Sequence, residues 1–131
     1  YKQKIAALLR KKGYEVVDYG TYSEESCDYS DFGHALGSAI DNGDVDLGVA
    51  FCGSGNGISM TLNKHQKVRA ALCWGTELAR LAKAHNNANV LVMPARFISY
   101  QMATTILNKW LTTEFEGGRH ERRIEKIPLC K

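Results

Sequence analysis

The sequence predicts an α/β fold, a doubly wound (Rossmann-like) parallel sheet with helices on both faces. Short apolar segments alternate with amphipathic segments along all 131 residues, which is typical of this fold class. The segment 45–52 ("VDLGVAFC") is almost continuously apolar, as expected for a parallel strand that is buried on both faces. No internal repeat or low-complexity linker interrupts the alternation, so we expect a single domain over residues 1–131.

The first half of the chain opens on an amphipathic helix over residues 1–12. Ile5, Leu8 and Leu9 recur on one face of this helix, and Gly13 is suited to end it. Because this fold class usually opens on a strand, we expect a strand before Tyr1 in the complete molecule. The next elements are a strand at 14–20, a polar loop to about residue 28, a helix at 31–42, the strand at 45–52 and a helix at 56–64.

The second half repeats the same alternation. Thr76 is a candidate N-cap for a helix that continues to residue 86. Around this helix we expect strands at 68–73 and 89–93 and a helix at 99–111. The segment 116–127 ("EGGRHERRIEKI") predicts a glycine break and then a short basic helix, within a C-terminal arm over about 116–131.

The bulk composition is that of a soluble globular protein, and the cysteine pattern and the lack of a visible signal peptide lead us to expect it in the cytoplasm. Apolar residues make up 44% and charged residues 24% of the chain, and the net charge of +3 is too small to indicate nucleic acid by itself. No signal peptide or membrane-length apolar segment is visible. The cysteines have no C-x-x-C spacing and no zinc-like grouping with histidine, which favours reduced thiols and no metal. They are Cys27, Cys52, Cys73 and Cys130.

The stretch 49–60 ("VAFCGSGNGISM") carries the strongest chemical signal. Cys52 ends a strand, and glycines at alternate positions follow it up to the start of a helix. Backbone N–H groups at a helix start favour anions, and a thiol beside them ionises more easily than a free one. A lone cysteine can also pack as a small apolar residue, but this position favours a reactive role. Ile58 excludes the dinucleotide fingerprint, and it stands where a cysteine phosphatase loop needs arginine.

Two further polar stretches are candidates, and each has a simpler interpretation. The segment 83–89 ("KAHNNAN") places His85 and Asn86 between a helix and a strand, where a helix C-cap would use the same residue types. Arg119 and Arg123 are four residues apart, so they share a helical face and could clamp a phosphate, although a solvated basic helix has the same pattern. Arg96, just after the strand at 89–93, is a third candidate.

Together these motifs resemble one family. "CGSGNG", "NK", "VRAALCW", "AHNNANVL", "ARFI" and "EGGRHERRI" are similar to the type B ribose-5-phosphate isomerases, which also include isomerases of sugar 6-phosphates. The similarity runs from the first helix to residue 127. Some members replace the cysteine by a glutamate just after "GNG"; here that place is Ile58, so the chain resembles the members that use cysteine.

The resemblance implies a role for each candidate residue, with no cofactor. Cys52 is implied to be the catalytic base, and His85 to assist ring opening of the sugar. The loop is implied to hold the enediolate through Gly53, Ser54, Gly55, Asn56 and Gly57, with Ser54 where the family has serine or threonine. Asn86, Arg96, Arg119 and Arg123 are implied to bind substrate and its phosphate. The family also has an Asp-His pair after a first strand, and this sequence starts after that position.

The expected function is therefore the interconversion of ribose 5-phosphate and ribulose 5-phosphate. The resemblance also implies a homodimer or homotetramer with sites at the subunit interface, and no nucleic-acid or membrane partner. One alternative is the same chemistry on a six-carbon substrate, allose 6-phosphate or galactose 6-phosphate. Another is a phosphate- or nucleotide-binding module without catalysis, which would leave Cys52 and His85 without a task.

Overall fold

The computed structural model describes residues 2–20 and 29–129. The described residues contain a three-stranded parallel sheet in the order β1-β3-β2, and none of their helices is long and apolar enough to cross a membrane. The strands are β1 (Gly48–Cys52), β2 (Ala70–Leu72) and β3 (Val90–Pro94). The helices are α1 (Lys2–Lys11), α2 (Tyr29–Asp41), α3 (Asn56–Leu62), α4 (Thr76–Asn86), α5 (Tyr100–Thr112) and α6 (Arg119–Glu125).

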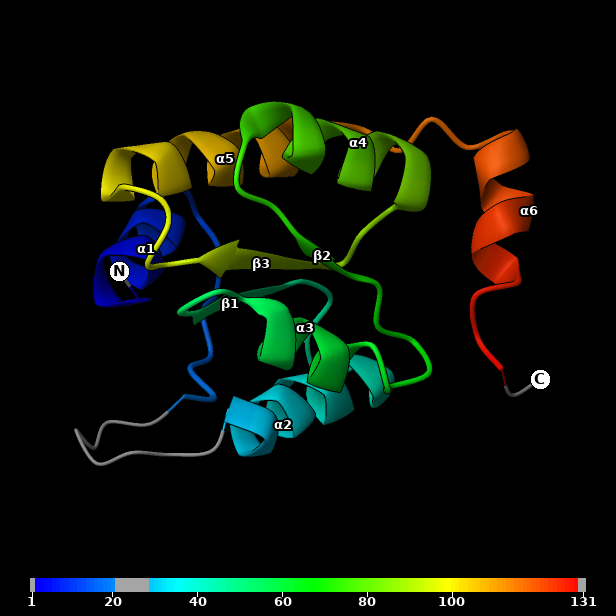
Figure 1. Ribbon diagram of the computed structural model, residues 1–131, viewed down its shortest axis with the longest axis horizontal. Helices are drawn as coiled ribbons and strands as arrows, with labels where there is room; N and C mark the ends of the chain where they lie inside the picture. The colour runs from blue at the N-terminus through cyan, green and yellow to red at the C-terminus, as the bar shows by residue number, and fades with distance from the viewer. Residues whose placement is uncertain (1, 21–28, 130–131) are drawn as a thin grey trace.

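The sheet is covered on both faces, which confirms the doubly wound class (Figure 1). Every residue of the central strand β3 is buried, and its side chains alternate between two apolar clusters. Val90 and Val92 pack with residues of α2 and α3, while Leu91 and Met93 pack with residues of α1, α4 and α5. A strand with apolar neighbours on both sides needs no polar face, which is the reason for its continuous apolar sequence.

The strand register places one polar stretch at each end of the sheet. Gly48 pairs with Val90 at the start of β1 and β3, and Cys52 pairs with Pro94 at their carboxyl ends. Helix α4 runs back over the sheet and ends just before β3 begins, so its last turn lies at the amino ends of the strands (Figure 1). These two regions are called the carboxyl edge and the amino edge below.

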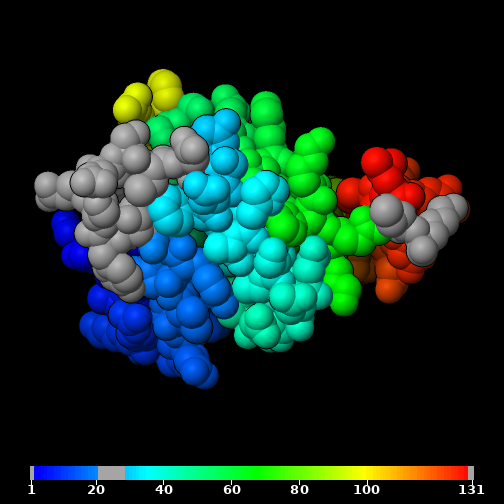
Figure 2. Space-filling view, turned by 90° about the horizontal axis from the view of Figure 1, so that it is seen from below, coloured from blue at the N-terminus to red at the C-terminus, as the bar shows by residue number. Residues whose placement is uncertain are grey.

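The short helix α6 lies beyond the amino edge. It contacts the end of α4, and the space-filling view shows it as a projection from one end of the molecule (Figure 2). Its arginines are exposed, and His120 is its one buried residue among those that the structure describes.

Three details differ from the sequence-based expectations. No strand is found at 14–20, because a strand needs a neighbour to pair with and β1 pairs only with β3 among the described strands. Thr76 is the first residue of α4 rather than its cap, and the N-cap Gly75 offers no side chain. Strand β1 starts at Gly48, not at residue 45, and is only partly buried. The predicted loop to about residue 28, Cys27 and Cys130 lie outside the described residues.

The two described cysteines have different surroundings. Cys73 is 1% exposed in the cluster between the sheet and α4, and burial raises the pKa of its thiol to about 11. Cys52 is partly exposed at the carboxyl edge. Because the thiolate is the reactive form, burial makes Cys73 less reactive, and Cys52 is the accessible thiol of the two.

We therefore expect iodoacetamide to label Cys52 well before Cys73 in the folded protein at pH 7–8. A thiol with a pKa near 11 is ionised in about one molecule in ten thousand at pH 7 and about one in a thousand at pH 8. Mass spectrometry of the digested protein reports the labelling of each cysteine over time. Unfolding in denaturant should make the two rates similar, and equal rates without denaturant would contradict the burial difference.

Candidate active site

The carboxyl edge is built around the end of β1. The chain leaving β3 turns towards this end: the amide of Ala95 donates to the carbonyl of Cys52 at 2.9 Å, and the amide of Arg96 donates to Gly53 at 3.1 Å. Two successive backbone bonds therefore hold Arg96 beside the cysteine loop. The thiol, the loop and one arginine are brought together within a single chain.

Arg96 lies directly against Gly53. A Cβ atom added to Gly53 would lie 3.2 Å from both Cδ and Nε of Arg96, closer than an ordinary van der Waals contact. The absence of a side chain at Gly53 thus lets the guanidinium stem rest on the loop. Arg96 is exposed and forms no salt bridge with the described carboxylates, so its charge is available to an anionic ligand.

The rest of the loop turns the chain into α3. Gly55 has φ +81°, and a Cβ atom here would collide with the Leu72 side chain, so both backbone conformation and space require glycine. Ser54 accepts a hydrogen bond from the Asn56 amide at 3.3 Å. The first amides of α3 have no acceptor within their own helix, which leaves N–H donors close to Cys52.

Tyr29 also borders this loop, although no sequence motif points to it. Its ring occupies the space where a Cβ atom of Gly57 would be, about 2.5 Å from that position. The side chain is half exposed, so it forms part of the wall beside the loop. Only the folded arrangement of α2 against α3 shows this proximity.

The amino edge holds His85 and Asn86 in the last turn of α4. The C-cap interpretation is right for the next residue: Asn87 has φ 46°, and its amide bonds back to Ala82 and Lys83. Asn89 is also structural, because its side-chain amide bonds the backbone of Lys67 and Arg69. His85 and Asn86 remain at least partly exposed beside these fixed residues.

Glu116 and His120 complete a cluster with His85 that sequence reasoning missed. The rings of His85 and His120 are stacked, with centroids 4.2 Å apart and an interplanar angle of 11°. Nε2 of each ring lies 3.6 Å from the same oxygen of Glu116. Desolvation, followed by the charges of His85 and Arg119, lowers the pKa of His120. The i,i+4 spacing of Glu116 and His120 was the only available signal in the sequence.

This cluster also offers the atoms of a possible metal site. One ligand atom from each of His85, Glu116 and His120 lies within 4.8 Å of the others. An imidazole binds an ion in the plane of its ring, and two nearly parallel stacked planes do not meet at one ion. The observed arrangement is therefore better suited to interaction among the three side chains than to a shared metal.

Arg119 and Arg123 lie one turn apart on α6, as the sequence predicts. Both are exposed, and the charges of both lower the pKa of His120, which places them near the histidine pair. The amino edge thus combines a polar cluster with two accessible positive charges.

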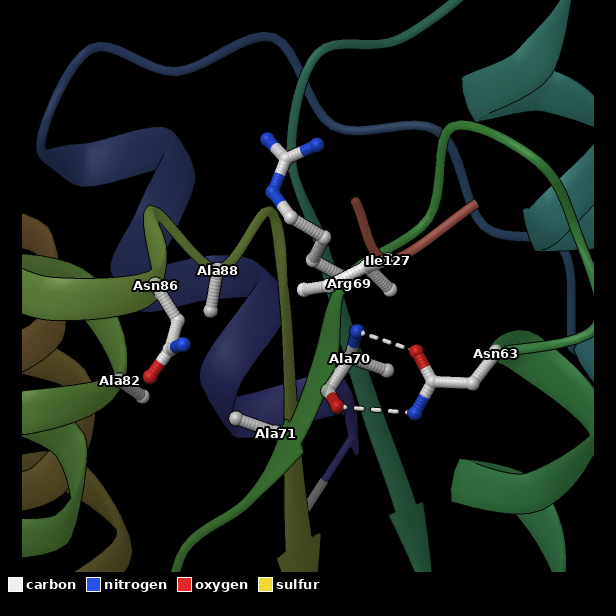
Figure 3. Close-up of a pocket in the computed structure, with 8 residues that line it drawn as sticks. All are labelled: Asn63, Arg69, Ala70, Ala71, Ala82, Asn86, Ala88 and Ile127. Carbon is white, nitrogen blue, oxygen red and sulfur yellow. Dashed lines mark hydrogen bonds between the residues drawn. The ribbon is translucent and has the colours of Figure 1, made fainter. Parts of the chain in front are cut away.

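A hollow of about 280 Å³ lies beside Asn86 at the free side of β2 (Figure 3). Its floor is mainly alanine, and the side chain of Asn63 closes one side by bonding both backbone groups of Ala70, at 2.8 and 3.0 Å. Arg69 on its rim is held by the carbonyl of Asn87 at 3.1 Å. The polar groups of this hollow are therefore largely engaged in holding the strand.

The two edges lie at opposite ends of the sheet. Five residues of β3 separate them, and at about 3.3 Å per residue this is on the order of 15 Å. One chain brings together Cys52, the glycine loop and Arg96, but it does not bring His85, Asn86, Arg119 or Arg123 to them. The predicted site residues form two groups.

Comparison with known proteins shows similarity to sugar-phosphate isomerases along nearly the entire chain. The family model described as Ribose/Galactose Isomerase matches residues 1–127. Ribose-5-phosphate isomerase B of Escherichia coli is 40% identical over 96% of this chain and 85% of its own length. A relative from Pectobacterium atrosepticum, 38% identical over 96% of this chain and 84% of its own length, is named D-erythrulose-4-phosphate isomerase.

Solved structures agree in fold. A ribose 5-phosphate isomerase from Thermotoga maritima is 47% identical, with a TM-score of 0.93 over 98% of this chain and 89% of the other. Ribose-5-phosphate isomerase B from Mycoplasma genitalium, solved with bound ribulose-5-phosphate, is 41% identical, with a TM-score of 0.91 over 96% and 84%. The chain therefore belongs to the ribose/galactose isomerase family.

Proposed function

We propose that the protein interconverts ribose 5-phosphate and ribulose 5-phosphate, with Cys52 as the base. The observation that carries the proposal is the carboxyl edge of a member of this family. Here a partly exposed thiol, a glycine loop and an arginine with no salt bridge to the described carboxylates converge. A relative with bound ribulose-5-phosphate supports the choice of a five-carbon substrate.

In the proposed reaction, the Cys52 thiolate removes the proton from C2 of the open-chain aldose. The electron pair forms the C1–C2 double bond while the carbonyl electrons move to O1, which gives the enediolate. A proton then passes from the O2 hydroxyl to O1, and the Cys52 thiol returns its proton to C1 as C2 becomes the ketone carbonyl. Backbone amides of residues 53–57 hold the oxygen that becomes negative, and Ser54 and Asn56 contact the sugar. Since these donors are fixed by the turn into α3, they need little reorganisation when the charge develops.

The nearest alternative is the same reaction on allose 6-phosphate or galactose 6-phosphate. The family description includes galactose, and one extra carbon changes the depth of a site more than its chemistry. A binding module without catalysis is less consistent with an accessible thiol beside the loop.

The substrate proposal predicts a clear order in an isomerase assay. We expect kcat/KM to be highest for ribose 5-phosphate among the phosphates of ribose, allose and galactose, and Cys52→Ala to lose about 10²–10⁴-fold in kcat. The Cys52→Ala protein should still bind a phosphate ligand, and Cys73→Ala serves as the matched cysteine control. Near-normal turnover by Cys52→Ala would remove the base assignment, and a preference for a six-carbon sugar would favour the alternative.

The separation of the two edges supports a site shared between two copies of the chain. Cys52 and His85 are proposed to act on neighbouring atoms of one small sugar, yet they lie at opposite ends of the sheet. A second copy that presents its amino edge to the first would supply His85, Asn86, Arg119 and Arg123. We infer a homodimer, or a larger assembly of such pairs, in which the arginines bind the phosphate.

This arrangement predicts complementation between inactive chains. Cys52→Ala subunits and Arg119→Ala/Arg123→Ala subunits should each be nearly inactive, and a mixed dimer should regain one intact site. Random exchange of equal amounts should restore about a quarter of the wild-type activity. Mixing before and after subunit exchange, with mixed dimers verified by native mass spectrometry, gives the measurement. If mixed dimers form without activity, each site is built within one chain.

His85 is proposed to open the sugar ring. As the C1–O4 bond of the furanose breaks, its electron pair and a proton go to O4, while the O1 hydroxyl loses a proton and becomes the aldehyde oxygen. A histidine can exchange these protons near neutral pH. Ribulose 5-phosphate cannot close a five-membered ring, because its O5 is phosphorylated.

A His85→Ala enzyme should therefore depend on ring opening in solution. With ribose 5-phosphate, its rate should stop rising with enzyme concentration once uncatalysed opening becomes limiting. The rate of the wild-type enzyme should stay proportional to enzyme concentration over the same range. If the rate of the variant, although reduced, still rises in proportion to enzyme concentration, His85 acts in another step.

A further inference from the structure

The stacked pair of His85 and His120 is held from two directions. Glu116 is fixed beside the end of α4, because its amide donates to the Ala84 carbonyl at 2.9 Å. His120 is placed by α6, where its amide bonds Gly117 at 3.2 Å. The His120 side chain is 11% exposed, whereas the side chains of His85 and Glu116 are 37% and 53% exposed. The accessible ring is therefore supported by a buried ring and a tethered carboxylate.

The geometry of the cluster disfavours a positive charge on both rings. Two positive charges about 4 Å apart repel each other, so the stacked rings oppose protonation of both imidazoles at once. Desolvation and the charges of His85, Arg119 and Arg123 keep His120 neutral more readily than a free histidine, and only Glu116 acts in the opposite sense. The carboxylate of Glu116 therefore lies beside the more exposed of the two rings, that of His85.

We propose that Glu116 and His120 are positioning residues that hold the His85 ring ready for proton transfer to and from the sugar. This inference rests on the proposed function, which assigns ring opening to His85. Nε2 of His85 lies 3.6 Å from the Glu116 carboxylate, so we assign proton exchange with the substrate to Nδ1. The parallel ring of His120 limits rotation of the His85 ring about its Cβ–Cγ bond.

The decisive comparison uses a sugar phosphate that has no ring to open. D-Erythrose 4-phosphate carries its phosphate on O4 and cannot close a furanose ring, and a relative is named for the corresponding ketose. Glu116→Gln should lower kcat with ribose 5-phosphate by about 10- to 100-fold, with KM changed less than about threefold. Turnover of D-erythrose 4-phosphate should stay within about twofold of the wild type.

Matched variants separate positioning from general effects. Glu114→Gln removes the same charge from an exposed residue two positions away and should leave both substrates unaffected. Glu116→Asp should restore part of the ribose 5-phosphate activity, since it retains the carboxylate. His120→Phe keeps a flat ring and should retain more activity than His120→Ala; circular dichroism checks that both variants fold.

If Glu116→Gln loses the same factor in kcat on both sugars, or loses none on either, the positioning role of Glu116 is wrong. The proposed function still stands in that case, provided that the wild type converts ribose 5-phosphate at a normal rate. A wild type inactive with both sugars overturns the function and this inference together. If the wild type converts only ribose 5-phosphate, the rate is measured at increasing concentrations of Glu116→Gln. We expect this rate to level off, as proposed for His85→Ala. A rate that stays proportional to enzyme concentration overturns the positioning role.

Discussion

The burial of β3 between its two parallel neighbours is the constraint on which the rest of the structure depends. All five of its residues are buried, and alternate side chains enter different apolar clusters. A strand in this position cannot carry a polar side chain without a partner, so chemistry is confined to its two ends. Parallel pairing with β1 then fixes which residues meet at each end: Cys52 and the chain after Pro94 at one, the end of α4 at the other.

The fold class and the carboxyl edge could be predicted from local sequence. Apolar periodicity located the helices and the three observed strands to within a few residues, and the glycines after Cys52 marked the turn into α3. The prediction of a strand at 14–20 was wrong, because apolar content does not reveal whether a neighbouring strand is present to pair with it. Thr76 is not the cap, because Gly75 is the last extended residue and Thr76 already has helical backbone.

The amino edge could be predicted only in part. Family resemblance selected His85, Asn86, Arg119 and Arg123, but Glu116 and His120 acquire their significance from the contact between α6 and the end of α4. That contact depends on how the segment after α5 passes the end of α4, where the amide of Glu116 donates to the Ala84 carbonyl. Local sequence does not reveal which helix end this segment meets.

The exposed apolar side chains fit the proposed sharing of sites between copies. Trp74 and Phe97 follow β2 and β3 at the carboxyl edge, and they are 56% and 75% exposed. Met60 on α3 is 68% exposed, beside the turn that Cys52 begins. Large exposed apolar groups such as these favour association when a partner covers them. The same contact that buries them would bring a second copy's basic α6 to the thiol. Association and completion of the site would then be one event, which explains how a chain with its reactive groups at opposite ends can be an enzyme.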